Sequence, residues 1–402
     1  LNMEENMVSK KMSFYLQSNS VIRAMFEEGN RLRKEFGPEN VYDFSLGNPN
    51  VASPAEVKEA IQKLIDEEDS VALHGYMNNA GFEDVCQKIA KSLNSKFGTG
   101  FSKKNLIMTV GAASGLNIIL KTIINPEDEV IVFAPYFLEY ASYIRNYDGK
   151  LVEISPDTST FQPNLAELRE KITVKTRAVI INTPHNPTGV VYSEDTIKEL
   201  SAILSEKQKE FGEAIYLLSD EPYRELAYDQ VEVPYITKYY PNTIVVYSYS
   251  KSLSLPGERI GYVVIPDELE DSEDVIAAAT IANRISGFVN APSLIQKVIG
   301  ECLDTKVNLS YYDRNRIALY EGLQRLGLEC IKPQGAFYLF VKSPVANEND
   351  FVNSAKKYNI LMVPGSAFAC PGYVRLAYCV SYECIMNSLP AFEKLMQEYV
   401  IA

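Results

Sequence analysis

Histidine is scarce in this chain, because only His74 and His185 occur among its 402 residues. Two histidines exclude a metal site built from several imidazoles, and they leave few candidates for a histidine general base. His185 precedes Asn186 and His74 lies two residues before Tyr76, and we expect both histidines to have structural roles. We expect no metal site. Any chemistry must therefore rest largely on lysine, carboxylates, tyrosine or a cofactor.

The sequence also lacks the usual features of secreted, membrane-spanning and nucleic-acid-binding proteins. No apolar run is long enough to span a membrane, and the N-terminal "LNMEENMVSKKMS" has no signal-peptide core. A net charge of −13 argues against a nucleic-acid partner held by a general positive field. The cysteines lie far apart without a C-x-x-C pair, which indicates reduced thiols and a cytoplasmic location. They are Cys86, Cys302, Cys330, Cys370, Cys379 and Cys384.

The chain does contain a regular alternation of short apolar runs and helical patterns. Continuous apolar strands separated by helices predict an α/β fold with a mostly parallel seven-stranded sheet between two layers of helices. One connecting stretch, "SEDTIKELSAILSEKQKE", has apolar residues at helical spacing and Ser193 as its expected cap. The predicted strands lie in 105–110, 129–135, 150–155, 177–184, 214–222, 243–250 and 261–266.

Both ends of the chain differ from this middle part. From about residue 306 a long helical pattern leads to strands in "GAFYLFV" and "YVRLAYCV" and to a closing helix, which predicts a smaller α+β domain. The first 50 residues contain one helical pattern and a short strand in "YDFSLG". This is too little for a domain, so we expect the segment 1–50 to join the small C-terminal domain, 306–402. The large domain is then 51–305.

Small or polar residues follow several predicted strands, and in such sheets ligands bind beyond the carboxyl ends of the strands. "TVGAASGLN" places Gly111 at a strand-to-helix turn, where backbone N–H groups can approach a phosphate. Asp220 ends "LLSD", and Lys251 ends "SYSK". Each feature alone is more often a turn, a cap or packing. Together they suggest pyridoxal 5′-phosphate, bound as a Schiff base to Lys251 with Asp220 at its ring nitrogen.

Motifs in a fixed order extend this interpretation to nearly the whole chain, from about Asp43 to Tyr382. The sequence contains, in order, "GNPN", Y-x4-G at Tyr76–Gly81, "TVGAASGL", "APYFLEY", "HNPTG", "SDEPY", "SYSKSLSLPGERIGY" and "RLAY". In this set and order the chain resembles class I aminotransferases of fold type I. The resemblance implies pyridoxal 5′-phosphate as cofactor. It also implies transfer of an amino group from an L-amino acid to a 2-oxo acid such as 2-oxoglutarate.

The resemblance also implies roles for residues of these motifs. Lys251 resembles the lysine that binds the cofactor and shuttles the proton, and Asp220 the partner of the ring nitrogen. Tyr223 and Asn186 resemble the donors to the 3-oxygen of the ring. The peptide Asn186–Pro187 is expected to be cis.

Further residues resemble the groups that hold the phosphate, the ring and the substrate. Phe137 resembles the aromatic residue that stacks on the ring. Arg375 resembles the arginine that binds the substrate α-carboxylate, with Asn186 and the backbone of Gly47 beside it. Tyr76 resembles a tyrosine that reaches the cofactor phosphate of a neighbouring subunit, which implies a homodimer with shared active sites. The expected phosphate ligands are Gly111, Ala112, Ala113, Ser248, Ser250 and Arg259.

Substrate choice is the least specific part of the resemblance. Some aspartate aminotransferases of the family bind the distal carboxylate with a lysine two residues after the glycine of "TVG", but here Ala113 takes that place. Another branch uses an arginine from the neighbouring subunit, shortly before an Asn-Pro-Pro segment. In "NRISGFVNAPS" Arg284 lies six residues before Asn290. Arg284 is therefore a candidate to bind the side chain of an acidic amino donor, although a surface arginine fits the sequence equally well. An aromatic donor is the second hypothesis.

Two other functions compete with transamination. A β-lyase or decarboxylase of the same fold would use the same Lys251 and Asp220. A cofactor-sensing transcription regulator would need a basic DNA-binding domain before the fold, and only about 40 acidic-leaning residues precede it here, so we discount it.

Overall fold

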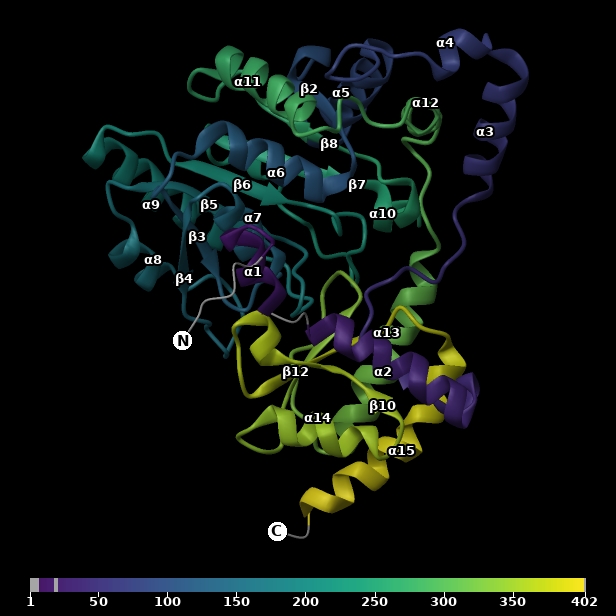
Figure 1. The fold of residues 1–402 in the computed structure, drawn as a ribbon. Coiled ribbons are helices and arrows are strands. Elements are labelled where there is room, and N and C mark those ends of the chain that lie inside the picture. The colour runs from purple at the N-terminus through teal and green to yellow at the C-terminus, as the bar shows by residue number, and fades with distance from the viewer. Residues whose placement is uncertain (1–6, 18–20, 401–402) are drawn as a thin grey trace.

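The centre of the protein is a seven-stranded sheet in the order β2-β8-β7-β6-β5-β3-β4, seen in the computed structural model, which describes residues 7–17 and 21–400 (Figure 1). Only β8 runs against its neighbours, β2 and β7, so the sheet is mostly parallel as predicted. All seven predicted runs form strands. They are β2 (Leu106–Thr109), β3 (Glu129–Phe133), β4 (Lys150–Ile154), β5 (Thr176–Asn182), β6 (Tyr216–Asp220), β7 (Thr243–Ser248) and β8 (Gly261–Val264).

The continuous apolar character of these strands follows from burial on both faces of the sheet. Side chains alternate between the faces along a strand. Val130 and Val132 of β3 accordingly join the core beneath α6, α7 and α11, and Ile131 joins the core beneath α8 and α9. Figure 1 shows helices on both sides of the sheet. They are α6 (Gly111–Ile123), α7 (Glu139–Asn146), α8 (Leu165–Lys171), α9 (Glu194–Phe211) and α11 (Ser272–Ile285).

Helix α9 shows how local sequence sets these elements. Its cap is Ser193, as predicted, whose side chain accepts a hydrogen bond from the backbone N–H of Thr196. Gly212 ends the helix in a left-handed conformation with φ 69°, which glycine adopts without a Cβ clash. The other helices of this part are α3 (Ala55–Glu67), α4 (Ser70–His74), α5 (Glu83–Phe97), α10 (Tyr249–Ser252) and α12 (Ser293–Glu301).

The topology brings several polar strand ends to one edge of the sheet. Strands β5, β6 and β7 are adjacent and parallel, so their carboxyl ends meet at that edge. Asn182 of β5 lies opposite Asp220 of β6 in the register, and Asp220 lies opposite Val246 of β7. Since Lys251 follows β7 within one turn of helix, Asp220 and Lys251 approach the same edge.

The C-terminal part forms a second, smaller set of sheets. Strands β9 (Tyr338–Lys342) and β11 (Val363–Pro364) pair antiparallel with β12 (Tyr373–Ala377), and β1 (Tyr42–Asp43) pairs with β10 (Ile360–Leu361). The pairing of β1 with β10 joins the N-terminal segment to the C-terminal part, as expected. The boundaries at residues 50 and 305 stay a prediction. The helices here are α13 (Leu309–Arg325), α14 (Glu348–Lys356) and α15 (Tyr382–Val400).

The N-terminal segment differs from the prediction of a single helix, which was wrong. The structure has two helices, α1 (Lys10–Gln17) and α2 (Val21–Phe36). The sequence between them is Ser-Asn-Ser, and these residue types favour helix caps and turns because their side chains compete for backbone hydrogen bonds. Across the two described stretches of chain, no helix is both long enough and apolar enough to cross a membrane.

Candidate active site

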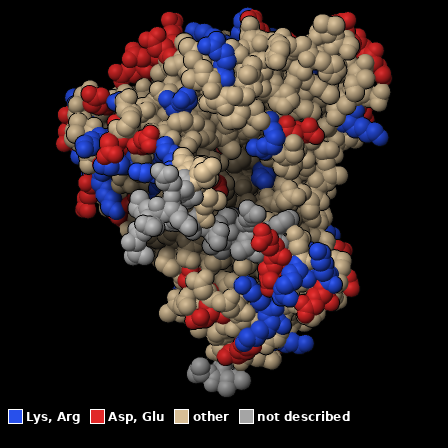
Figure 2. Space-filling model, in the orientation of Figure 1, with Lys and Arg blue, Asp and Glu red and all other residues tan. Residues whose placement is uncertain are grey.

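A pocket opens at the sheet edge where the strand ends meet, and it is lined from both parts of the protein. Figure 2 shows the hollow between the upper part, with the large sheet, and the lower part, with the C-terminal strands. Its volume of about 320 Å³ lies at the lower end of the usual range for small-molecule sites. The predicted site residues that line it are Gly47, Ala112, Ala113, Phe137, Asn186, Asp220, Tyr223, Ser248, Ser250, Lys251, Arg259 and Arg375.

Lys251 projects into this pocket from the short helix α10. The Ser248 side chain caps that helix by accepting from the backbone N–H of Ser250, which places Lys251 in its only turn. The Lys251 Nζ donates to the carbonyl oxygen of Gly47 at 2.8 Å. Burial, together with smaller effects of the charges of Arg375 and Arg259, lowers the pKa of Lys251 to about 8, although Cys379 acts in the opposite direction. A sizeable fraction of this lysine is therefore a neutral amine in mildly alkaline solution.

Asp220 ends β6, and its carboxyl group is buried with only one of its two oxygens hydrogen-bonded within the described part of the chain. Its Oδ2 accepts a hydrogen bond from the Tyr140 hydroxyl at 2.5 Å. Its Oδ1 is buried and has no hydrogen-bond partner among the residues that the structure describes. Burial raises the pKa of Asp220 to about 7, although the Tyr140 hydrogen bond acts in the opposite direction. A buried oxygen without a partner is costly, so this atom is suited to a cationic donor within the pocket.

Arg375 reaches the pocket from β12. Its Nη1 donates to Oδ1 of Asn186 at 3.1 Å, and its Nη2 donates to the carbonyl oxygen of Ser45 at 2.8 Å. The Nε is buried and has no acceptor in the described part of the chain. The guanidinium also lies over the rings of Tyr338, at 4.5 Å, and Phe368, at 4.7 Å. Arg375 is thus held in place and still has an unused donor for an anion.

The opposite end of the pocket is built from hydroxyl groups, small residues and Arg259. The Ser248 hydroxyl lies 2.8 Å from that of Ser250. Gly111 has φ +80°, and a Cβ there would lie 2.7 Å from Nη2 of Arg259, so this turn requires glycine beside the guanidinium. Gly111 also opens α6, whose N-terminal N–H groups favour an anion. Cation, hydroxyls and helix N-terminus together suit a phosphate.

Some predicted residues do not line the pocket of this chain. Tyr76 is 94% exposed, and Arg284 is exposed at the end of α11. Gly111 itself lies just behind the pocket wall formed by Arg259. His185 is buried, and its Nδ1 lies 2.6 Å from the hydroxyl oxygen of Thr188, while His74 is exposed. The burial of His185 agrees with the structural role expected of it, whereas the expectation for His74 stays a prediction.

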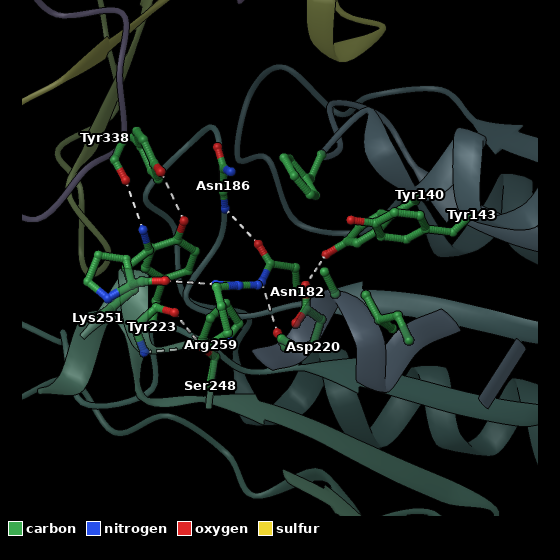
Figure 3. A pocket seen from close by; sticks show the side chains of 18 of the residues that line it. Tyr140, Tyr143, Asn182, Asn186, Asp220, Tyr223, Ser248, Lys251, Arg259 and Tyr338 are labelled. Atoms are coloured by element: carbon green, nitrogen blue, oxygen red, sulfur yellow. Dashed lines mark hydrogen bonds between the residues drawn. The ribbon is translucent and has the colours of Figure 1, made fainter. Parts of the chain in front are cut away.

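The pocket also contains residues that the sequence analysis did not name. Figure 3 shows Tyr140 and Tyr143 on one side, and Tyr338 beside Lys251 on the other. The Asn182 amide donates to the carbonyl oxygen of Asp220, and its Oδ1 accepts from the backbone N–H of Asn186. Asn182 could have been predicted as a polar residue at a strand end. Tyr140 and Tyr338 carried no such signal, because each belongs to a run of aromatic residues typical of a core.

The expected cis peptide between Asn186 and Pro187 is confirmed. It lies in the turn after β5 that presents Asn186 to Arg375. The six cysteines are all unpaired, as expected.

Comparisons with known proteins agree with this architecture. An aspartate aminotransferase of Pyrococcus horikoshii is 28% identical over 95% of this chain and 96% of its own length. An aromatic-amino-acid aminotransferase of Thermococcus litoralis is 28% identical over 90% of this chain and 93% of its own length. A crystal structure of an amino transferase from Eubacterium rectale is 48% identical, with a TM-score of 0.96 over 98% of this chain and 100% of that one.

A family description matches most of the chain as well. The model of "Aminotransferase class I and II" covers residues 39–387, a span that includes both the large sheet and the C-terminal strands. Enzymes of this family generally use pyridoxal 5′-phosphate. The chain therefore belongs to the class I and II aminotransferase family.

Proposed function

We propose that this protein transfers the amino group of an aspartate-like or aromatic L-amino acid to a 2-oxo acid such as 2-oxoglutarate, with pyridoxal 5′-phosphate as cofactor. One observation carries the proposal. The Lys251 amine shares a single pocket with Oδ1 of Asp220 and Nε of Arg375, and neither of these two atoms has a hydrogen-bond partner among the described residues. An amine that can exchange a proton, an acceptor for a ring N–H and a donor for a carboxylate are the groups that this reaction needs.

The polar groups of the pocket fit this cofactor. A protonated ring nitrogen would satisfy the Oδ1 of Asp220, which otherwise stays buried without a partner among residues 7–17 and 21–400. Phe137 lines the pocket and offers a ring to stack on, and Tyr223 and Asn186 offer donors for the 3-oxygen. The phosphate would lie between Arg259, the serine hydroxyls and the first turn of α6. The residues that we propose to hold the phosphate are Gly111, Ala112, Ala113, Ser248, Ser250 and Arg259.

The cofactor, when bound, supplies an electron sink for negative charge at the α-carbon of the amino acid. Asp220 contributes a fixed negative charge that keeps a proton on the ring nitrogen. The neutral Nζ of Lys251 takes the proton from the substrate α-carbon, and the lowered pKa of Lys251 makes that form accessible. The carbonyl oxygen of Gly47 accepts from Nζ and so keeps the amine in the pocket.

Arg375 binds and orients the substrate through its α-carboxylate. Its Nε, and the edge of the guanidinium beside it, can donate to both carboxylate oxygens. Two of the other donors are already committed to Asn186 and Ser45, so rotation of the guanidinium is restricted. The α-carbon is thereby held at a set distance from Lys251, which lowers the entropic cost of reaching the transition state.

The donor side chain must fit the space that remains. Of the lysines and arginines in the described part of the chain, only Lys251, Arg259 and Arg375 line the pocket, and each has a role above. An acidic donor therefore needs a further cation, and Arg284 of a second copy is our candidate. If Arg284 does not enter the pocket, the apolar and aromatic lining at Leu116 and Tyr143 favours an aromatic donor. The two named relatives, one acting on aspartate and one on aromatic amino acids, support keeping both classes.

We propose that the active form is a homodimer with shared active sites, in the cytoplasm. Tyr76 is exposed and its loop is tied to α11, because the Asn283 amide of that helix donates to the carbonyl oxygen of Asn79. The two residues that we expect to act in the neighbouring subunit, Tyr76 and Arg284, thus lie in connected segments. Large exposed apolar side chains in the same elements support an interface there. They are Tyr76 in the loop after α4, and Ile281, Ile285 and Val289 in α11 and just after it.

A donor screen tests the proposal. The protein loaded with pyridoxal 5′-phosphate is mixed with one L-amino acid at a time, while the absorbance of the bound cofactor and the products are followed. We expect aspartate or phenylalanine to yield its 2-oxo acid, and we expect 2-oxoglutarate to restore the starting spectrum. Release of ammonia, or of carbon dioxide, without a 2-oxo acid of the same carbon skeleton would instead indicate a β-lyase or a decarboxylase.

A further inference from the structure

Tyr338 connects the substrate-binding side of the pocket with the cofactor-binding side. It opens β9, and in the register of the small sheet it lies opposite Ala377 of β12, while Arg375 lies opposite Phe340. Residues two apart on a strand share a face, so Tyr338 and Arg375 are diagonal neighbours on one face. The Arg375 guanidinium accordingly lies 4.5 Å from the centre of the Tyr338 ring.

The hydroxyl of Tyr338 meets the other part of the protein. It lies 2.9 Å from the hydroxyl of Tyr223, in the turn after β6, and both side chains are buried (Figure 3). A Cβ on Gly47 would lie 2.1 Å from the Tyr338 hydroxyl oxygen, so the hydroxyl fits only because residue 47 is glycine. Tyr338 thus touches Arg375, Tyr223 and Gly47, three residues that belong to different motifs.

The direction of the hydrogen bond between the two tyrosines decides what Tyr223 can do. If Tyr223 donates to Tyr338, its only hydrogen is used and it cannot donate into the pocket. If Tyr338 donates, the Tyr223 hydrogen is free for an acceptor in the pocket. Each hydroxyl is a hydrogen-bond partner of the other at 2.9 Å, and both side chains are buried. A Tyr223 hydroxyl that donates into the pocket can therefore keep this contact only as the acceptor, with Tyr338 as the donor.

We propose that Tyr338 is a positioning residue that donates to Tyr223 and thereby orients the Tyr223 hydroxyl and strengthens it as a donor to the 3-oxygen of the cofactor. The inference rests on the proposed function, since it concerns the same cofactor. Through its ring, Tyr338 also supports the guanidinium of Arg375. One side chain therefore aligns the donor to the cofactor and the clamp for the substrate carboxylate.

The hydroxyl and the ring of Tyr338 can be tested separately. Tyr338→Phe removes only the hydroxyl and keeps the ring beneath Arg375, whereas Tyr338→Leu removes both. Tyr228→Phe is a matched control, because the Tyr228 hydroxyl is also buried and donates to the carbonyl oxygen of Ala336 at 2.6 Å, outside the pocket lining. Each variant is loaded with pyridoxal 5′-phosphate, and the absorbance of the bound cofactor is titrated with pH.

We expect Tyr338→Phe to raise the apparent pKa of the bound cofactor by roughly half to one pH unit, the size of one weakened hydrogen bond. An anionic 3-oxygen that is less stabilised is more basic, so the bound cofactor should keep its proton to a higher pH. Tyr223→Phe removes the donor itself and should therefore shift the pKa in the same direction and further. The double variant should match Tyr223→Phe alone, because Tyr338 acts through Tyr223. Tyr228→Phe should not shift it. Tyr338→Leu should in addition raise the KM for amino acids several-fold.

The inference is overturned if Tyr338→Phe leaves the cofactor titration unchanged, or if the shifts of the two single variants add in the double variant. A shift of equal size in Tyr228→Phe would also overturn it, because loss of any buried hydroxyl would then be sufficient. The proposed function fails in a different way, since in that case the wild-type protein would show neither the cofactor absorbance nor transamination.

Discussion

Replacing Asp220 with asparagine is expected to stabilise the cofactor-free protein, and more so as the pH rises. Burial raises the pKa of Asp220 from 3.8 to about 7. Between these two values the folded protein binds a proton that the unfolded chain releases. The stability of the wild type therefore falls as the pH rises through this window. Asparagine cannot ionise and can still accept from Tyr140, so the variant escapes this loss.

The magnitude follows from the size of the pKa shift. One pKa unit corresponds to about 1.36 kcal/mol of differential free energy. Between pH 5 and pH 8 the wild type should lose roughly 2.5 kcal/mol of unfolding free energy that the Asp220→Asn variant keeps. Above pH 8 the difference should stay constant, because Asp220 is then ionised in both the folded and the unfolded state.

Urea unfolding of the cofactor-free proteins at several pH values between 5 and 8 measures this difference directly. Asp304→Asn is the control, because it makes the same change of side chain at an exposed position. A stability difference between the wild type and Asp220→Asn that stays constant across this range would refute the reasoning. Bound cofactor should reverse the order, since a cationic ring nitrogen stabilises the carboxylate and cannot pair with asparagine as strongly.

Three further predictions concern the loaded enzyme. Lys251→Ala should abolish turnover and the borohydride-reducible absorbance of the cofactor, and a reducible, active variant would show that another amine is used. Arg375→Lys should raise KM for every amino donor in steady-state assays, because an ammonium cannot copy the two-pronged contact; a defect limited to one donor would place Arg375 at the side-chain pocket instead. Arg284→Leu should reduce kcat/KM for aspartate by on the order of 10²-fold and spare phenylalanine, about the effect of one lost charged contact. Equal losses for both donors would rule out a role in acidic recognition.

Much of the fold could be predicted because the apolar runs are unambiguous. Seven continuous runs separated by helical patterns became seven strands of one sheet, since strands buried on both faces need apolar residues at every position. Short polar segments were harder to interpret. The N-terminal segment was expected to hold one helix and holds two, because a short polar sequence gives only a weak signal for where one helix ends and another begins.

Site residues could be predicted where they directly follow a strand that the sequence itself indicates. Asp220 and Lys251 each follow a buried strand, and parallel neighbours deliver such residues to one edge of the sheet. Tyr76 and Arg284 are different, because their expected partners belong to another copy of the chain. Their exposure is consistent with that role, and it stays a prediction.

The sequence by itself determined the layered sheet, the family and the residues that follow the strands, because local periodicity and compact motifs encode them. Only the tertiary structure decided which distant side chains form hydrogen bonds with the residues that follow the strands. Tyr140 donates to Asp220 across 80 residues of sequence, and Tyr338 bonds to Tyr223 across 115. In the sequence both tyrosines lie in aromatic runs that read as core. Their hydroxyls became part of the pocket because burial demands a partner for each polar atom, and packing of distant segments decides which partner is within reach.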